Sequence, residues 1–164
     1  TLNDTDEYIW EDFWRRICHI LSVLFESYPD GNLRINWLSL RYIDAIEFNY
    51  KEDNIFSFLK NNLKINIELY QKLFEETGVD NLPLNFDLRF SFPATKVKGS
   101  SNLRFARGKK NELDALIWET QVQSIDEDVP RDKNEINIWI DEAHKLADDW
   151  FFKMIEGELL RRFE

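Results

Sequence analysis

The sequence has few of the residues that mark flexible chains, crosslinked scaffolds and membrane spans. Among its 164 residues are five Gly, four Pro and one Cys, Cys18. So little Gly and Pro excludes a collagen-like or low-complexity chain, and a single thiol excludes an internal disulfide. No apolar run approaches the roughly 20 residues that a membrane-spanning helix needs, and no secretory signal pattern opens the chain. We therefore expect a reducing, cytoplasmic setting with no membrane contact.

Large apolar side chains are plentiful, and the 31 acidic residues outnumber the 21 basic ones. Hydrophobic residues make up 43% of the chain, with thirteen Phe and six Trp, and the formal net charge is -10. A chain of this length can form one core that buries roughly 70% of its unfolded surface. We therefore predict a single domain over residues 1–164. Because the chain starts at Thr1 and not at Met, we interpret it as the C-terminal part of a longer protein.

Two segments carry apolar residues at the three- and four-residue spacing of an amphipathic helix. The first runs from Asp4 to Tyr28, and its Asp4 and Glu7 have the spacing of a capping box. The second runs from Asn134 to Glu164. Its stripe is expected to face a sheet through Trp139, Ala143, Leu146, Trp150, Met154 and Ile155.

Four segments between these helices have the pattern of a strand. Alternating apolar residues are clearest from Leu84 to Phe92, where Pro93 is expected to end the strand. Such alternation predicts one core face and one solvent face. A turn at Gly108–Asn111 is expected to join the last two strands. The predicted strands are Leu33–Asn49, Leu84–Phe92, Asn102–Arg107 and Glu112–Ile125.

The segment between the first two strands has a broken helical pattern. One short piece begins with Asp53 as its cap and is interrupted at Asn61–Asn62, and a second piece is expected to end at Gly78. Since the strands come as a run and do not alternate with helices, we predict an α+β fold. Its mainly antiparallel, four-stranded sheet carries the N- and C-terminal helices on one face, with the broken helix between strands 1 and 2.

Asp44 is a charged residue that the alternation of the first strand directs into the core. A buried carboxylate requires a partner, so a structural pairing is the favoured interpretation. The alternative is a functional site, in which Arg41, Asp44 and Glu47 form a polar cluster.

The terminal helix contains the letters Asp141-Glu142-Ala143-His144, which match the second motif of DEAH-box helicases. No phosphate-binding loop G-x-x-x-x-G-K-[ST] accompanies them, and the helical stripe runs straight through them, so we reject a nucleotide motor. Asp141 and His144 also have the i, i+3 spacing by which helices share a metal. A matching second helix is missing, because His19 lacks a carboxylate at that spacing. We assign no catalytic residue, metal or cofactor.

The stretch 96–110 is basic inside an acidic protein, and no acidic residue interrupts it. Accessible positive charge of this kind suits contact with phosphates or other anions. The alternative is an edge hairpin that lysines protect from aggregation. The basic residues are Lys96, Lys98, Arg104, Arg107, Lys109 and Lys110.

Two parts of the sequence resemble a known family. The run Leu40-Arg41-Tyr42-Ile43-Asp44-Ala45-Ile46-Glu47 resembles the signature L-R-Y-I-x-x-I-E. The ending W…H…F…I…L…F that accompanies this signature is similar to Trp139, His144, Phe151, Ile155, Leu159 and Phe163. Together they look like the C-terminal region of a sporadically distributed family of prokaryotic proteins of unknown function. The resemblance implies a prokaryotic cytoplasmic origin and a preceding N-terminal region, and it supplies no catalytic residue.

These observations favour a non-catalytic binding or interaction module. Its expected partner is another protein or the remainder of a longer chain. One alternative is an enzyme whose site is completed by an N-terminal region, with Arg41, Asp44 and Glu47 as its contribution. Another is nucleic-acid or anion contact through 96–110, which the net charge of -10 opposes.

Overall fold

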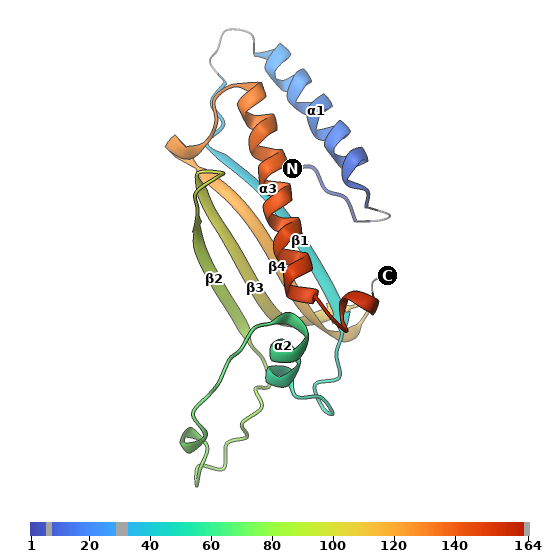
Figure 1. Cartoon of the computed structure of the whole chain (residues 1–164), viewed down its shortest axis with the longest axis vertical. Coiled ribbons are helices and arrows are strands. Elements are labelled where there is room, and N and C mark those ends of the chain that lie inside the picture. The colour runs from blue at the N-terminus through green and yellow to red at the C-terminus, as the bar shows by residue number, and fades with distance from the viewer. Residues whose placement is uncertain (6–7, 29–32, 163–164) are drawn as a thin grey trace.

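The computed structural model describes residues 1–5, 8–28 and 33–162 (Figure 1). Glu7 and Phe163, which two of the sequence patterns use, lie outside the described residues. Helices are labelled α, strands β and 3₁₀ turns η. In chain order the elements are α1 (Trp10–Ser27), β1 (Trp37–Glu47), α2 (Ile55–Leu63), η1 (Gln71–Leu73), β2 (Asp87–Ala94), β3 (Gly99–Lys110), β4 (Leu113–Ile125), η2 (Asp126–Asp128), α3 (Lys133–Ile155) and η3 (Leu160–Arg162).

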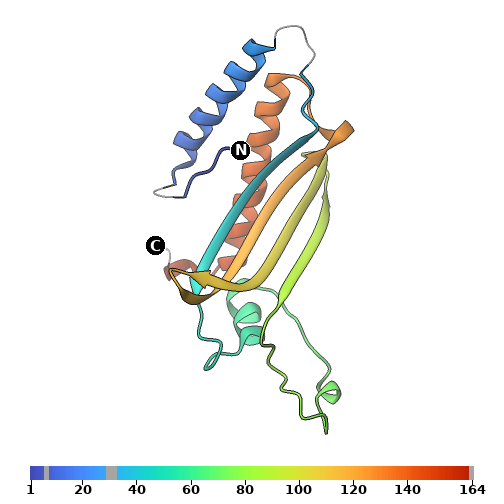
Figure 2. The ribbon, with the colours of Figure 1, turned by 180° about the vertical axis from the view of Figure 1, so that it is seen from behind.

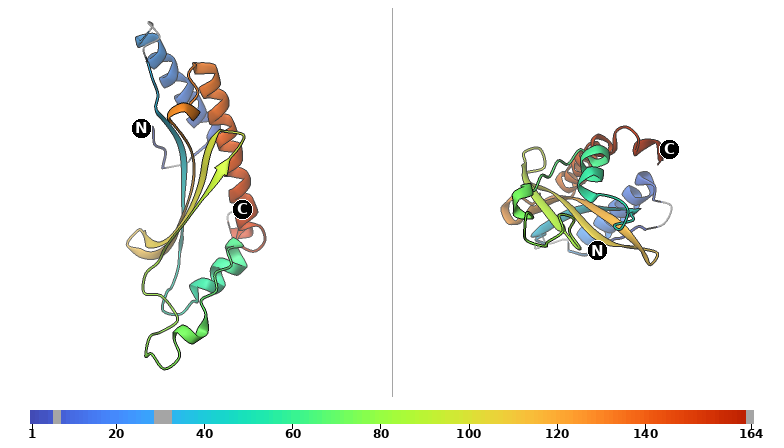
Figure 3. Two further views of the ribbon diagram at one scale, coloured as in Figure 1. Left: turned by 90° about the vertical axis from the view of Figure 1, so that its left-hand side faces the viewer. Right: turned by 90° about the horizontal axis from the view of Figure 1, so that it is seen from below.

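The four strands form one antiparallel sheet in the order β1-β4-β3-β2. The long helix α3 lies across one face, mainly over β4, and α1 lies beside α3 (Figures 1 and 3). We call this covered side the inner face. The described helices leave the other, outer face uncovered, as the view from behind shows (Figure 2). The predicted α+β class, with an antiparallel sheet and terminal helices on one face, is confirmed.

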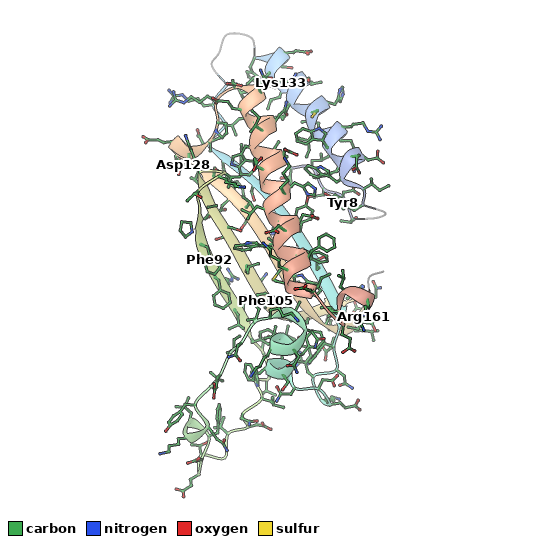
Figure 4. The ribbon with its side chains drawn as sticks, in the orientation of Figure 1. Tyr8, Phe92, Phe105, Asp128, Lys133 and Arg161 are labelled. Atoms are coloured by element: carbon green, nitrogen blue, oxygen red, sulfur yellow. The ribbon has the colours of Figure 1, made fainter. Side chains whose placement is uncertain are left out.

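The core lies between α3 and the inner face of the two central strands. Alternation along β4 directs Leu116, Trp118 and Val122 inward, and all three are fully buried. At one end of the sheet, the indole of Trp139 donates a hydrogen bond to Val97 O (3.0 Å) and one to Ser124 Oγ (2.7 Å). These bonds fix the position of α3 on the sheet. Side chains fill the space between this helix and the strands (Figure 4).

Helix α3 has well-defined ends. Its N-cap, Asp132, accepts hydrogen bonds from the backbone N–H groups of Asn134 (2.8 Å) and Glu135 (2.9 Å). It ends at Ile155, and Gly157 then takes a φ of 112°, which favours glycine. The predicted extension of this helix to Glu164 is therefore wrong. Of the residues expected to face the sheet, Trp139, Ala143, Met154 and Ile155 are buried, whereas Leu146 and Trp150 are half-buried.

The start of α1 differs from the prediction. The helix begins at Trp10, and its N-cap, Ile9, makes no side-chain cap bond. The carboxylate of Asp4 instead pairs with the guanidinium of Arg16 on the helix. Asp4 is thus a side-chain partner of α1 and not its cap.

Helix α2 also departs from the expected pattern. Its N-cap is Asn54, not Asp53, and the Asn54 side chain accepts a hydrogen bond from the N–H of Ser57 (3.0 Å). The helix continues through Asn61–Asn62 to Leu63. Its inward side chains, Leu59 and Leu63 among them, are fully buried, and this packing holds the last turn in place.

The second helical piece predicted before Gly78 is wrong. Residues 64–86 contain a single 3₁₀ turn, η1, and form an arm that extends beyond the end of the sheet (Figure 1). Lys64 and Glu76 have φ values of 58° and 59°, which an α-helix cannot continue through. Several large apolar side chains of this arm are exposed to solvent: Leu69, Tyr70, Leu73, Val79 and Leu84.

The strands are confirmed in number and order but differ in their ends. β3 runs on to Lys110, so the turn before β4 is Asn111–Glu112 and not Gly108–Asn111. Both turn residues have positive φ values, 49° and 66°, as in a two-residue hairpin turn of the mirror-image kind. β2 continues through Pro93 to Ala94. It is an edge strand, where a residue without an N–H is tolerated.

Candidate functional site

The predicted cluster of Arg41, Asp44 and Glu47 is divided by the sheet. Alternation along β1 places Asp44 on the inner face and Arg41 and Glu47 on the outer face. Arg41 Nη1 lies 3.8 Å from Glu119 Oε1 on that outer face, and Glu47 is exposed at the end of the strand. The three side chains therefore do not form one site.

Asp44 itself is an unusual carboxylate. Burial raises its pKa from 3.8 to about 6. Among the described residues, no hydrogen bond or ion pair reaches it. The register places it across from Trp118, whose buried Nε1–H also lacks an acceptor within the described part of the chain. The predicted inward direction is confirmed, but the structural partner that we expected for Asp44 is missing.

His144 belongs to a polar cluster that joins three elements. The hydroxyl of Tyr42, on β1, lies 2.9 Å from His144 Nδ1 and 2.9 Å from the hydroxyl of Tyr8. The indole of Trp10 stacks on the imidazole, with ring centroids 3.7 Å apart. Burial lowers the pKa of His144 and raises the pKa of Tyr42. The cluster attaches the segment before α1 to both β1 and α3.

No pattern in the sequence predicted this cluster. Tyr42 and His144 are 102 positions apart, and neither lies in a motif that indicates the other. Asp141, the proposed companion of His144, instead has its Oδ2 2.5 Å from Lys145 Nζ. Within residues 1–5, 8–28 and 33–162, no group of at least three His, Cys, Asp or Glu side chains is placed to hold a metal ion.

The basic stretch 96–110 does not form one basic surface. Lys96 and Lys98 lie in the turn before β3, whereas Lys109 and Lys110 lie at the opposite end of that strand. Arg104, between them, is bonded through Nε and Nη2 to Asp87 at 3.0 Å and 2.9 Å.

Arg107 is also engaged. Its Nη2 lies 2.7 Å from Asp114 Oδ2, and its guanidinium carbon lies 4.4 Å from the ring centroid of Tyr50. The two arginines within β3 are therefore paired, and the exposed lysines are divided between the two ends of the sheet. This arrangement does not favour a single anion site.

A different surface stands out, on the side of the molecule where β2 forms the edge of the sheet. Phe90 and Phe92 point to the inner face, where the sequence pattern predicted core, yet they are 38% and 44% exposed. α3 lies mainly over β4 and covers them only in part; the ring of Trp150 meets Phe92 edge-on at 5.7 Å. The predicted burial of this face is therefore wrong at Phe90 and Phe92.

The arm lies on the same side of the molecule as β2 (Figure 1). Its apolar side chains are even more exposed, and Leu84 reaches 90%. We define the β2 surface as Phe90 and Phe92 together with the exposed apolar residues of the arm: Leu69, Tyr70, Leu73, Val79 and Leu84. Exposed apolar side chains on one side of a protein are typical of an interaction surface.

A shallow depression lies elsewhere, between the N-terminal segment and α1, and its lining includes Leu2, Arg16, His19 and Ile20. It is remote from Asp44, which belongs to the sheet. No described helix is long and apolar enough to span a membrane. No protein-family model matches the sequence, and a search among curated proteins finds no match either.

Proposed function

We propose that this chain is a non-catalytic interaction module that binds another protein through the β2 surface. The observation that carries the proposal is the exposure of Phe90 and Phe92 beside an arm rich in exposed apolar side chains. Leaving such groups in water is unfavourable by roughly 25 cal/mol per Å² of apolar surface. A protein partner that covers them would recover this free energy.

The enzymatic alternative has less support. It relies on Arg41, Asp44 and Glu47 acting together, and the sheet separates Asp44 from the other two. Nucleic-acid contact through 96–110 is also less favoured, because the lysines lie at both ends of β3 and the net charge is -10. The single cysteine, Cys18, which is not in a disulfide, supports a cytoplasmic setting for the module.

A site-specific photocrosslinker tests the proposal. Benzoylphenylalanine is placed at Phe90 in one variant and at Leu73 in another, within cells that produce the protein. Ile43 is the matched control, since it is an exposed apolar residue on the other edge strand. We expect protein adducts from Phe90 and Leu73 and few from Ile43. Equal labelling at all three positions, or no adducts from Phe90 and Leu73, would contradict the proposal.

A further inference from the structure

We infer that the partner of the β2 surface is a second copy of this chain, which pairs with the first along the edge of β2 in a two-fold symmetric dimer. This inference rests on the proposed function, because it names the partner of the same surface. Three properties of β2 support it: the direction of its backbone groups, its exposed aromatic residues and the charges at its two ends.

The backbone of β2 can accept another strand. The N–H of Arg107 donates to Phe86 O (3.3 Å), which places even-numbered residues of this strand in the pairs bonded to β3. Asp87, Arg89 and Ser91 therefore turn their N–H and C=O groups away from β3, towards the unpaired edge. The backbone of Pro93 also faces the unpaired edge. Because proline has no N–H, the edge lacks one hydrogen-bond donor near its end.

An antiparallel pairing centred on Phe90 uses these groups. Arg89 of each copy then lies opposite Ser91 of the other, and both residues have the N–H and C=O groups that such a pair exchanges. Asp87 lies opposite Pro93 of the second copy, where the proline carbonyl can still accept. Pro93 thus restricts the register without preventing the pairing.

The same register covers the exposed aromatic residues. Phe90 faces Phe90 of the second copy, and Phe92 lies across from Leu88. Directly opposed side chains on one face of an antiparallel pair are close enough to pack together. The inner-face side chains that α3 leaves exposed would then be shielded by the same side chains of the partner copy.

The charges at the two ends of β2 are complementary. The arm before the strand is acidic on balance, with Glu68, Glu75, Glu76 and Asp80 against Lys64 and Lys72, whereas the turn after it carries the exposed Lys96 and Lys98. A two-fold axis through Phe90 brings the arm of each copy and the basic turn of the other to the same end of the paired strands. A symmetric interface requires this kind of self-complementarity.

The other edge strand, β1, lacks exposed aromatic residues on its inner face. Its inward Tyr42 is already bonded to Tyr8 and His144. The exposed apolar residues of β1, Trp37 and Ile43, lie on the outer face.

Charge exchange between two variants tests the inference by sedimentation equilibrium. One variant carries Lys96→Glu and Lys98→Glu, and the other carries Glu75→Lys and Glu76→Lys. All four positions are exposed, so both chains should fold like the wild type. We expect the wild type to dimerise, each variant to self-associate at least about tenfold more weakly, and an equimolar mixture to form a mixed dimer. In the mixture both arm–turn contacts again join opposite charges.

Phe90→Asp gives a second test, with Ile43→Asp as its matched control. Phe90→Asp should abolish the dimer and Ile43→Asp should leave it intact, while circular dichroism reports the fold of both. A wild-type chain that stays monomeric across the micromolar range would overturn the inference, as would a dimer insensitive to both the charge exchange and Phe90→Asp. Photocrosslinked adducts from Phe90 with a different protein would still support the proposed function in that case. A self-adduct has twice the mass of the chain, so the two failures are distinguishable.

Discussion

Replacing Asp44 by asparagine is expected to stabilise the protein at neutral and alkaline pH. The carboxylate faces the inner side of the sheet beside Trp118, and burial raises its pKa from 3.8 to about 6. A carboxyl group with a raised pKa in the folded state binds its proton more tightly there than in the unfolded chain. Above a pH of about 6 the buried carboxylate is ionised and the folded state is destabilised.

The size of this effect follows from the two pKa values. A rise from 3.8 to about 6 corresponds to about 3 kcal/mol of destabilisation when the group is ionised in both states. Because Asp44 is half-buried and water reaches part of its side chain, the gain expected for Asp44→Asn is about 1 to 3 kcal/mol. At a pH below 3.8, where the aspartate is neutral in both states, the two proteins should be almost equally stable.

Urea unfolding of wild type and Asp44→Asn at about pH 8 and about pH 3 measures both parts of this prediction. Glu47→Gln is the matched control, because Glu47 is an exposed carboxylate on the outer face of the same strand. It should change stability little at either pH. A loss of stability for Asp44→Asn at about pH 8 would refute the reasoning, since it would show that the carboxylate has a favourable partner.

Three further substitutions probe other parts of the fold by the same urea assay. Tyr42→Phe removes the hydroxyl between His144 and Tyr8, and we expect a loss of about 1 to 2 kcal/mol; no loss would mean that water replaces these bonds in solution. Trp150→Ala should cost about 3 kcal/mol, because the half-buried ring packs on Phe92; a negligible cost would place the ring in solvent. Glu112→Gly should raise the free energy of unfolding by about 1 kcal/mol, because the φ of 66° at this turn residue is strained for any residue with a Cβ. Glu112→Ala keeps the Cβ and should not raise it.

The sequence predicted those elements whose residues pack as their local pattern implies. The inward apolar residues of β4 are buried as expected, because α3 covers this strand. The same kind of alternation in β2 predicted strand correctly but burial wrongly. Alternation shows which residues share a face, and whether that face is covered depends on how far a distant helix extends. The exposure of Phe90 and Phe92 therefore depends on the position of α3, which the sequence of β2 does not contain.

The helix predicted within the arm does not form, because its apolar residues have little to pack against. Leu69, Tyr70 and Leu73 have helical spacing but remain 47%, 65% and 62% exposed, so they lack the buried face that stabilises a helix in a protein.

One feature of the candidate residues could be predicted from the sequence, and another could not. The division of Asp44 from Arg41 and Glu47 follows from even and odd positions along one strand, and the sequence already contained it. The contact between Tyr42 and His144 joins residues 102 positions apart, and only the three-dimensional fold brings them together.

The position of β4 in the sheet has a consequence for the order of folding. Of the four described strands, β1 is the first to leave the ribosome, and its sheet partner, β4, is the last. β2, β3 and β4 can join through short hairpins as they emerge, whereas β1 must wait with its backbone groups unpaired until residues 113–125 are made. During synthesis β1 is therefore an unpaired strand of the kind that makes a nascent chain prone to aggregation.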